Sequence, residues 1–257
     1  REQEKGTEPI EIIVVDDGSK DRTLETVLHY PGVICIRENH GGPARARNAG
    51  VRLARGEIVL FTDADCEPAR DWVKEMAKPF EDNEVAGVKG TYRTKQKEWV
   101  AKVVQAEYEG KYERMAKRET IDFIDTYSAG FRRAVFLQAG GFDPFFPDAS
   151  VEDQEFSFRL ARLGCKMVFN PRAVVYHRHA ASLMAYFLKK FRIGCWKIPV
   201  LKRHPGKILR DAHTPQTLKV ELVVSFTGLV ALAGGIFSGE DVLVRLGHSL
   251  LTVFAFL

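Results

Sequence analysis

The sequence predicts an α/β domain in which a mostly parallel, doubly wound sheet is flanked by helices. Three short apolar runs alternate with two helical segments over residues 10–62, and acidic clusters follow the first and third runs. This alternation is typical of βαβ units. With 45% apolar and 28% charged residues, the 257-residue chain is too apolar for a disordered protein and too charged for a polytopic membrane protein.

The first strand is expected at 10–15, where Ile-Glu-Ile-Ile-Val-Val suits a strand buried on both faces. The next elements are a helix at 21–30, a strand at 33–36, a helix at 43–55 and a strand at 57–62. Pro43 suits the first turn of a helix, and Gly56 suits the cap at its end.

The remaining elements complete one domain at residues 1–180. They are a helix from 71 to 80, a strand at 85–91, a polar helix at 98–118, an amphipathic helix at 152–163, and short strands at 166–169 and 173–176. In the amphipathic helix, Phe156, Leu160 and Leu163 share one face and Gly164 caps the end.

Two acidic clusters fall at the carboxyl ends of expected strands, the edge where open α/β sheets bind ligands. Asp63 and Asp65 can hold one hard divalent cation and leave room for phosphate oxygens, although a solvated turn would look the same. Of Asp16 and Asp17, one can accept a hydrogen bond from a nucleobase or ribose. The other can cap the following helix.

Basic and polar side chains open the second helix. Arg47 and Asn48 follow a Gly-Gly pair, and a helix N-terminus favours anions such as phosphate. The alternative is an ordinary solvated basic face.

The order of these motifs resembles family 2 glycosyltransferases over about residues 10–180. The motifs are Val-Val-Asp-Asp-Gly-Ser at 14–19, Gly-Pro-Ala-Arg-Ala-Arg-Asn-Ala-Gly at 42–50, Phe-Thr-Asp-Ala-Asp at 61–65, Gly-Gly-Phe-Asp at 140–143 and Glu-Asp-Gln-Glu-Phe-Ser-Phe-Arg-Leu at 152–160. The resemblance implies a GT-A fold, inversion at the sugar, a UDP- or GDP-sugar donor, and Mg²⁺ or Mn²⁺.

The resemblance also implies roles for individual residues. The expected donor-binding residues are Asp16, Asp17, Arg47, Asn48, Asp63, Ser128, Ala129 and Gly130, the last three forming a turn beside the donor sugar. Asp65 would be the direct metal ligand together with Asp63. Glu152 and Asp153 would be the catalytic acidic pair.

Asp153 would be the base that takes a proton from the acceptor hydroxyl. Its place at a helix start holds it rigidly, while the helix dipole is expected to lower its basicity. Either His177 or His179 would add a third metal ligand, unless they are surface or phosphate-contacting histidines.

Two departures from the family pattern bear on function. The family's usual first strand and nucleotide-facing loop would lie before residue 1, so we expect a chain truncated at that end. The Gln-x-x-Arg-Trp motif of processive synthases is absent, which favours transfer of a single sugar.

The charge distribution predicts a membrane surface as partner. The net charge is only +4, but residues 156–210 hold thirteen of the 38 Lys and Arg and none of the Asp and Glu. Residues 181–213 read as a basic interfacial helix with Tyr186 and Trp196 at headgroup level, or else as a helix packed on the domain.

The apolar residues 214–257 read as membrane helices, with two buried core helices as the alternative. Basic flanks then place the catalytic domain on the cytoplasmic side of the cell membrane. We expect a glycan or lipid-linked acceptor and no nucleic acid partner. Two other functions remain open, a nucleotidyltransferase and a non-catalytic, membrane-anchored binding protein with a degenerate transferase fold.

Overall fold

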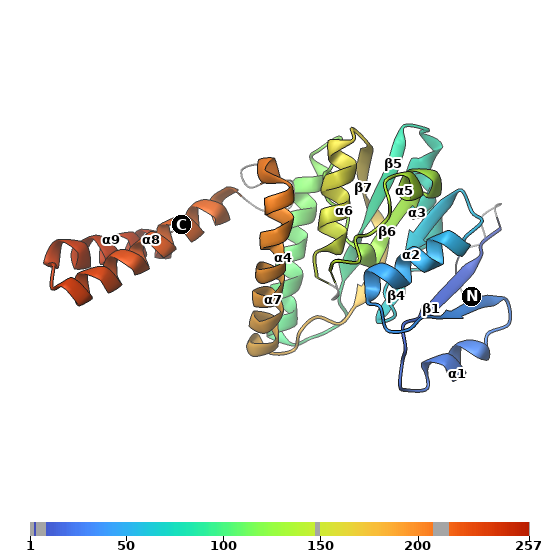
Figure 1. The fold of residues 1–257 in the computed structure, drawn as a ribbon, viewed down its shortest axis with the longest axis horizontal. Helices are drawn as coiled ribbons and strands as arrows, with labels where there is room; N and C mark the ends of the chain where they lie inside the picture. The colour runs from blue at the N-terminus through green and yellow to red at the C-terminus, as the bar shows by residue number, and fades with distance from the viewer. Residues whose placement is uncertain (1–2, 4–8, 147–149, 208–215, 257) are drawn as a thin grey trace. The chain divides into compact units, whose positions relative to one another are not determined.

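The computed structural model describes residue 3 and residues 9–146, 150–207 and 216–256 (Figure 1). The chain divides into two compact units, Arg1–Lys207 and Ile208–Leu257. The first unit holds β1 (Ile12–Asp16), α1 (Thr23–Leu28), β2 (Val33–Arg37), α2 (Pro43–Leu53), β3 (Ile58–Phe61), β4 (Cys66–Pro68), α3 (Trp72–Ala77), η1 (Lys78–Glu81), β5 (Val85–Arg93), α4 (Trp99–Ala116), η2 (Thr126–Ser128), β6 (Ala129–Arg132), α5 (Arg133–Gln138), α6 (Glu152–Arg162), β7 (Lys166–His177), α7 (Leu183–Arg203) and η3 (Pro205–Lys207). The second unit holds α8 (Gln216–Ser238) and α9 (Asp241–Phe256).

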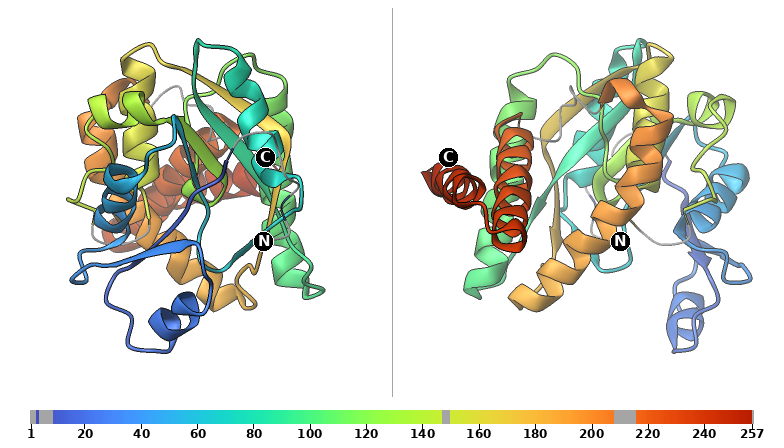
Figure 2. Two further views of the ribbon diagram at one scale, coloured as in Figure 1. Left: turned by 90° about the vertical axis from the view of Figure 1, so that its right-hand side faces the viewer. Right: turned by 60° about the vertical axis from the view of Figure 1, so that its left-hand side comes forward.

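The larger sheet is mixed, with the strand order β3-β6-β5-β7-β4. Within it β5 and β7 are parallel, while the β3–β6, β5–β6 and β4–β7 pairs are antiparallel. β1 and β2 form a separate parallel pair, and Figure 2 shows them in blue at one side of this unit with α1. The predicted α/β class is therefore confirmed, but a mostly parallel sheet was wrong. Apolar runs reveal buried strands without revealing their direction.

Two large apolar clusters pack on the sheet of the first unit. One joins the sheet to α2, α5 and α6, and the other joins it to α3 and η1. In the first cluster the ring of Phe156 lies 5.3, 4.8 and 5.0 Å, centroid to centroid, from Phe131, Phe136 and Phe142. Phe61 at the end of β3 packs on the same three rings, so this aromatic cluster joins α6 to the end of β3.

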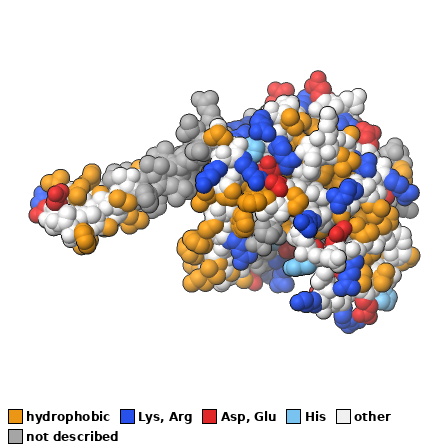
Figure 3. Space-filling view, viewed as in Figure 1, with side chains coloured by type: hydrophobic (Ala, Val, Ile, Leu, Met, Phe, Trp, Pro, Cys, Tyr) orange, Lys and Arg blue, Asp and Glu red, His pale blue; other side chains and the backbone are white. Residues whose placement is uncertain are grey.

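α7 belongs to the first unit and is apolar on two faces. Ile193, Trp196 and Val200 pack on a cluster that includes Phe146 and Phe158. The opposite stripe is exposed and contains Leu183, Met184, Phe187, Leu188, Phe191 and Ile198. Figure 3 shows hydrophobic side chains gathered where Figure 1 places α7.

The two aromatic residues expected at headgroup level face the rest of the first unit instead. Trp196 packs edge-on against Phe146, with ring centroids 6.0 Å apart. The hydroxyl of Tyr186 donates to Glu107 on α4 at 2.6 Å, and Lys190 donates to the same carboxylate at 2.7 Å. Docking of α7 uses the face that carries these groups.

The second unit consists of α8 and α9 packed on each other. A Cβ on Gly247 would lie 2.7 Å from the Leu232 amide nitrogen, so the helices approach closely at this glycine. Among the described residues no helix is long and apolar enough to cross a membrane, and the predicted membrane helices over 214–257 are therefore not supported. α9 and the uncharged stretch 222–237 of α8 each span 16 residues, short of the ~20 that cross a bilayer.

Replacing Phe156 by alanine is expected to lower the free energy of unfolding by about 3–5 kcal/mol, because the ring is fully buried and its loss leaves a cavity. Urea unfolding followed by tryptophan fluorescence measures the change. The control is Leu163→Ala at the end of the same helix, where the side chain is 62% exposed. Equal midpoints for the two variants would contradict the assigned core.

Candidate active site

Asp63 and Asp65 lie in the turn between β3 and β4. The Cys66 amide donates to the Asp63 carbonyl oxygen at 3.0 Å and closes the turn. β4 then pairs antiparallel with β7, which sets Cys66 opposite His177. As a result His177 Nε2 lies 2.9 Å from Asp65 Oδ2. Ligand atoms of Asp63, Asp65 and Cys66 lie within 4.8 Å of one another, so the predicted acidic pair does converge.

His177 is better placed than His179 to join this acidic pair. Its ring stacks on Tyr92 with centroids 4.8 Å apart, and its buried Nδ1 has no hydrogen-bond partner among the described residues. His179 Nε2 instead lies 3.0 Å from Gln105 Oε1. Burial, with His177 and Lys189 nearby, lowers the pKa of His179 to about 4. The sequence left both histidines open, and the structure favours His177.

Arg47 links the acidic pair to the start of α6. Its Nη2 donates to Asp63 Oδ1 at 2.8 Å and its Nη1 donates to Glu152 Oε1 at 2.7 Å. Burial alone would lower the pKa of Arg47, but these two carboxylates raise it. Charge-assisted bonds in a shielded setting are strong. The guanidinium, which we expected near the nucleotide, is thus occupied in holding two carboxylates together.

Asp153 stands beside Glu152 in the first turn of α6. Its Oδ1 accepts the Gln154 amide at 2.7 Å and its Oδ2 accepts the Thr126 amide at 3.4 Å. Burial and the Glu152 carboxylate raise the pKa of Asp153 to about 7, although Arg47 opposes the shift. The expectation of lowered basicity was wrong, because burial outweighs the helix dipole here.

Asp16 is the last residue of β1 and Asp17 follows it, and the two make different contacts. Asp16 Oδ1 accepts the Ser19 amide at 2.9 Å. Its buried Oδ2 has no hydrogen-bond partner among the described residues, although Arg37 Nε lies 3.6 Å away. The Asp17 carboxylate accepts the two amides of Gly41-Gly42 at 2.7 and 2.8 Å. Asp17 therefore fixes the loop that opens α2, not the start of α1, and a ligand contact of Asp16 stays a prediction.

The other predicted donor-binding residues are engaged in packing. Asn48 exchanges two hydrogen bonds with the Phe142 backbone, at 2.7 and 2.9 Å. Ser128 is fully buried, and its Oγ accepts the Trp72 indole N–H at 2.9 Å. Ala129 and Gly130 lie in β6, hydrogen-bonded between β3 and β5, not in a turn. A contact between this segment and a donor sugar stays a prediction.

The cluster suits a hard divalent cation. Two carboxylates, with His177 Nε2 beside Asp65, are oxygen and nitrogen ligands of the kind Mn²⁺ takes, and Mg²⁺ shares the preference for carboxylates. Burial, with both aspartates nearby, raises the pKa of the Cys66 thiol to about 11. Sequence reasoning missed Cys66 in this cluster, although it directly follows Asp65.

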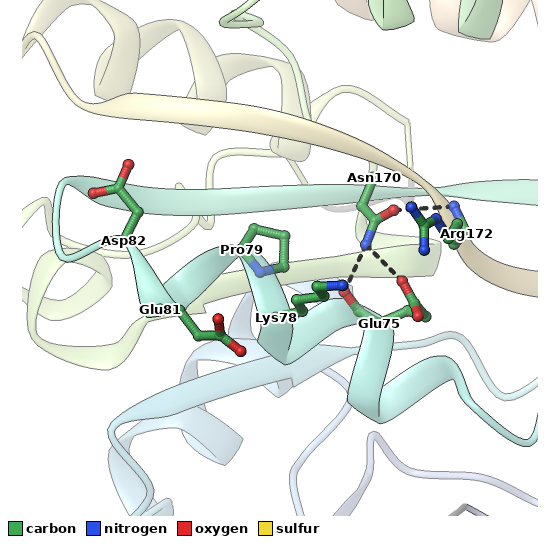
Figure 4. A pocket seen from close by; sticks show the side chains of 7 residues that line it. All are labelled: Glu75, Lys78, Pro79, Glu81, Asp82, Asn170 and Arg172. Carbon is green, nitrogen blue, oxygen red and sulfur yellow. Dashed lines mark hydrogen bonds between the residues drawn. The ribbon is translucent and has the colours of Figure 1, made fainter.

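A hollow of about 430 Å³ lies elsewhere in the first unit (Figure 4). It is lined by Glu75, Lys78, Pro79, Glu81, Asp82, Asn170 and Arg172. Asn170 Nδ2 donates to the Glu75 carbonyl at 2.7 Å across it. The hollow shares no residue with the acidic pair, Arg47 or Asp153. The candidate site is therefore defined by side chains that converge, and not by this hollow.

The mixed sheet and the acidic turn after β3 define an α/β fold of the GT-A type, the fold of nucleotide-sugar glycosyltransferases. Residues 1–139 match the sequence model described as Glycosyl transferase family 2. The chain belongs to this family.

Curated relatives agree with this assignment. Pre-mycofactocin glycosyltransferase of Mycobacterium tuberculosis is 28% identical over 249 residues, covering 87% of this chain and 49% of that protein. Glucosyl-dolichyl phosphate glucuronosyltransferase of Haloferax volcanii is 27% identical over 191 residues, covering 66% of this chain and 60% of that protein. The chain thus spans about half the length of the first of these relatives and 60% of the second.

Solved structures show the same fold. Mannosyltransferase PcManGT from Pyrobaculum calidifontis, in complex with GDP-Man and Mn²⁺, aligns with a TM-score of 0.61 at 22% identity, over 99% of this chain and 68% of that one. Residues 1–349 of TarS from Staphylococcus aureus, in complex with UDP, align with a TM-score of 0.55 at 20% identity, over 93% and 68%. At these identities the likeness concerns the fold.

Changing Asp65 to asparagine is expected to weaken Mn²⁺ binding by roughly 10-fold or more, since losses of that size follow even from removing groups that only orient a ligand. Isothermal titration calorimetry with Mn²⁺ measures it. The matched control is Glu67→Gln on β4, whose exposed carboxylate pairs with Lys95 outside the cluster. If both variants bound Mn²⁺ like the unaltered chain, the acidic pair would not be the metal site.

Proposed function

We propose that this chain is the catalytic part of an inverting glycosyltransferase. It moves a single sugar from a UDP- or GDP-sugar to an acceptor hydroxyl with the help of Mg²⁺ or Mn²⁺. The observation that carries the proposal is the Arg47 bridge, which brings the acidic pair at the end of β3 to the helix that bears Asp153. The PcManGT complex with GDP-Man and Mn²⁺ and the TarS complex with UDP support the donor class and the metal.

Asp153 acts as the base in this proposal. A half-buried carboxylate with a pKa of about 7 is matched to proton transfer near neutral pH. Its carboxylate removes the proton of the acceptor hydroxyl while that oxygen attacks the sugar carbon from the side opposite the leaving diphosphate. Glu152 does not serve as a second base, because its carboxylate holds Arg47 and is 2% exposed.

Asp63, Asp65 and His177 would hold the divalent cation. When bound, the cation offsets the charge that develops on the leaving nucleoside diphosphate. The Arg47 guanidinium keeps the Asp63 carboxylate in place from the other side. Asp16 supplies the acceptor oxygen for a base or ribose, and Asp17 shapes the loop at the N-terminus of α2, where phosphate is favoured.

The acceptor in this proposal is a glycan or a lipid-linked sugar at the cytoplasmic face of the cell membrane. The exposed apolar stripe of α7 supports binding of the chain to a membrane surface, because six large apolar side chains face away from the domain. The lack of acidic residues from 156 to 210 favours anionic lipid. The Haloferax volcanii relative is named for a glucosyl-dolichyl phosphate, and this name supports a lipid-linked sugar as the acceptor.

A donor screen tests the reaction class. The full chain is mixed with Mn²⁺ and UDP-, GDP- or dTDP-sugars, and nucleoside diphosphate release is measured. Diphosphate release that requires the metal supports the proposal. Pyrophosphate release would indicate a nucleotidyltransferase, and absence of metal-dependent nucleotide binding would indicate a non-catalytic binding protein.

Asp153→Asn is expected to lower turnover by roughly 10²–10⁴-fold while nucleotide affinity stays unchanged, since the base acts on the acceptor and not on the donor. In the unaltered enzyme kcat should be full above pH 7 and fall as pH drops below it, because Asp153 works only when ionised. Diphosphate release across pH 5–9 measures both. Asp21→Asn, an exposed carboxylate before α1, is the control. Near-normal turnover in Asp153→Asn would remove this residue from the mechanism.

Replacing Phe187 and Phe191 together by serine is expected to weaken binding to phosphatidylglycerol-containing vesicles by at least ~10-fold, because both rings are more than 60% exposed and available to the bilayer. Vesicle co-sedimentation measures the binding. Leu28→Ser on α1, a side chain 70% exposed, is the control. Unchanged binding in the double variant would show that α7 does not contact lipid.

A further inference from the structure

A lysine is fully buried in the sheet close to Asp153. Lys89 on β5 is 1% exposed. Its ammonium donates to the Tyr127 hydroxyl at 3.0 Å and forms an ion pair with Asp125. The rings of Tyr127 and Phe123 lie 4.8 and 5.4 Å from the same nitrogen. A charge in such surroundings is stable only when it is paired, so Lys89 and Asp125 are held together.

The segment that Lys89 holds is also the segment that contacts Asp153. The Thr126 amide, one residue after Asp125, donates to Asp153 Oδ2 at 3.4 Å. Two residues earlier the Ile124 amide donates to Ser157 Oγ at 3.0 Å, and Ser157 Oγ donates to the Asp153 carbonyl at 2.7 Å. The chain at 124–127 therefore lies between the buried lysine and the first turn of α6.

The same segment reaches the metal side of the site. The Tyr127 ring stacks on Tyr92, and Tyr92 stacks on His177, which contacts Asp65. Lys89 thus anchors a chain segment that touches both halves of the candidate active site. A side chain that only filled space in the core would not need an ammonium group at this position.

We propose that Lys89 is a positioning residue for Asp153. Its bonds to Asp125 and Tyr127 hold the 125–127 segment so that the Thr126 amide meets the Asp153 carboxylate, and its charge favours the ionised form of that carboxylate. The inference rests on the proposed function, because that function makes Asp153 the catalytic base.

The charges around Asp153 determine which way each substitution acts. The charged and titratable groups that act on it are Glu152 on α6, Arg47 on α2, Lys89 on β5 and Tyr108 on α4. Asp125, just before η2, pairs with Lys89. Burial lowers the pKa of Lys89, and the Asp153 carboxylate opposes this effect. Lys89 attracts negative charge at Asp153, and Asp125 competes with Asp153 for the same ammonium. Removing one member of the pair must therefore shift Asp153 in the direction opposite to removing the other.

A ¹³C-carboxyl NMR titration of the full chain tests this, with the Asp153 signal assigned by its loss in Asp153→Asn. Lys89→Met should raise the midpoint of Asp153 by on the order of one pH unit, and Asp125→Asn should lower it. Lys89→Arg, which keeps the charge, and the double variant Lys89→Met/Asp125→Asn should stay closer to the unaltered chain. The signal of Asp21, an exposed carboxylate before α1, serves as the reference.

Midpoints that do not move, or that move in the same direction in Lys89→Met and Asp125→Asn, would overturn the proposal. If Lys89→Met does not fold, the midpoint of Asp153 in Asp125→Asn is the test. A lower midpoint supports the proposal, and an unchanged or higher one overturns it. The titration needs no turnover, so an inactive chain would count against the proposed function and leave this result standing. Where the chain is active, the low-pH limb of kcat should follow the NMR midpoints of the same variants.

Discussion

The geometry of the site depends on one buried guanidinium. Arg47 donates to Asp63 and to Glu152, which come from segments far apart in the sequence. Without a cation between them, these carboxylates would repel each other and separate the turn after β3 from the start of α6. A lysine would place one point charge there, whereas the planar fork of arginine bonds both partners at once. Buried ion pairs add little net stability, so the value of this contact lies in the position it imposes.

The sequence located the local elements that carry the site. The second helix was expected at 43–55 and lies at Pro43–Leu53, and the amphipathic helix was expected at 152–163 and lies at Glu152–Arg162. Direction within the sheet was not predictable, because β6 begins in Ala-Gly directly after Ser128, a sequence that reads as a turn. Its strand character comes from insertion between β3 and β5. The three-residue strand β4 exists only because β7 pairs with it.

Site residues could be predicted where they directly follow a strand or stand in a recognisable motif. They could not be predicted where their position depends on how distant strands pair. The convergence of Asp63 and Asp65 could be inferred from their place after β3. The choice of His177 over His179 required the β4–β7 pairing. Lys89 lies in a Gly-Val-Lys-Gly run that has no feature of a buried cation. α7 is apolar on two faces, so the sequence could not show which face packs on the domain.

Paramagnetic broadening by Mn²⁺ tests the central claim, that the metal site and the base are held at one place by the Arg47 bridge. The chain is labelled with ¹³C at its aspartate carboxyl groups and titrated with Mn²⁺, with Mg²⁺ as the diamagnetic reference. The account predicts that the signals of Asp63 and Asp65 vanish first and that Asp153 broadens strongly. The signal of Asp82, which lies before β5 and is paired with Lys166 at the start of β7, should stay sharp. Loss of the Asp82 signal before that of Asp153, or an Asp153 signal that Mn²⁺ does not affect, would contradict the account.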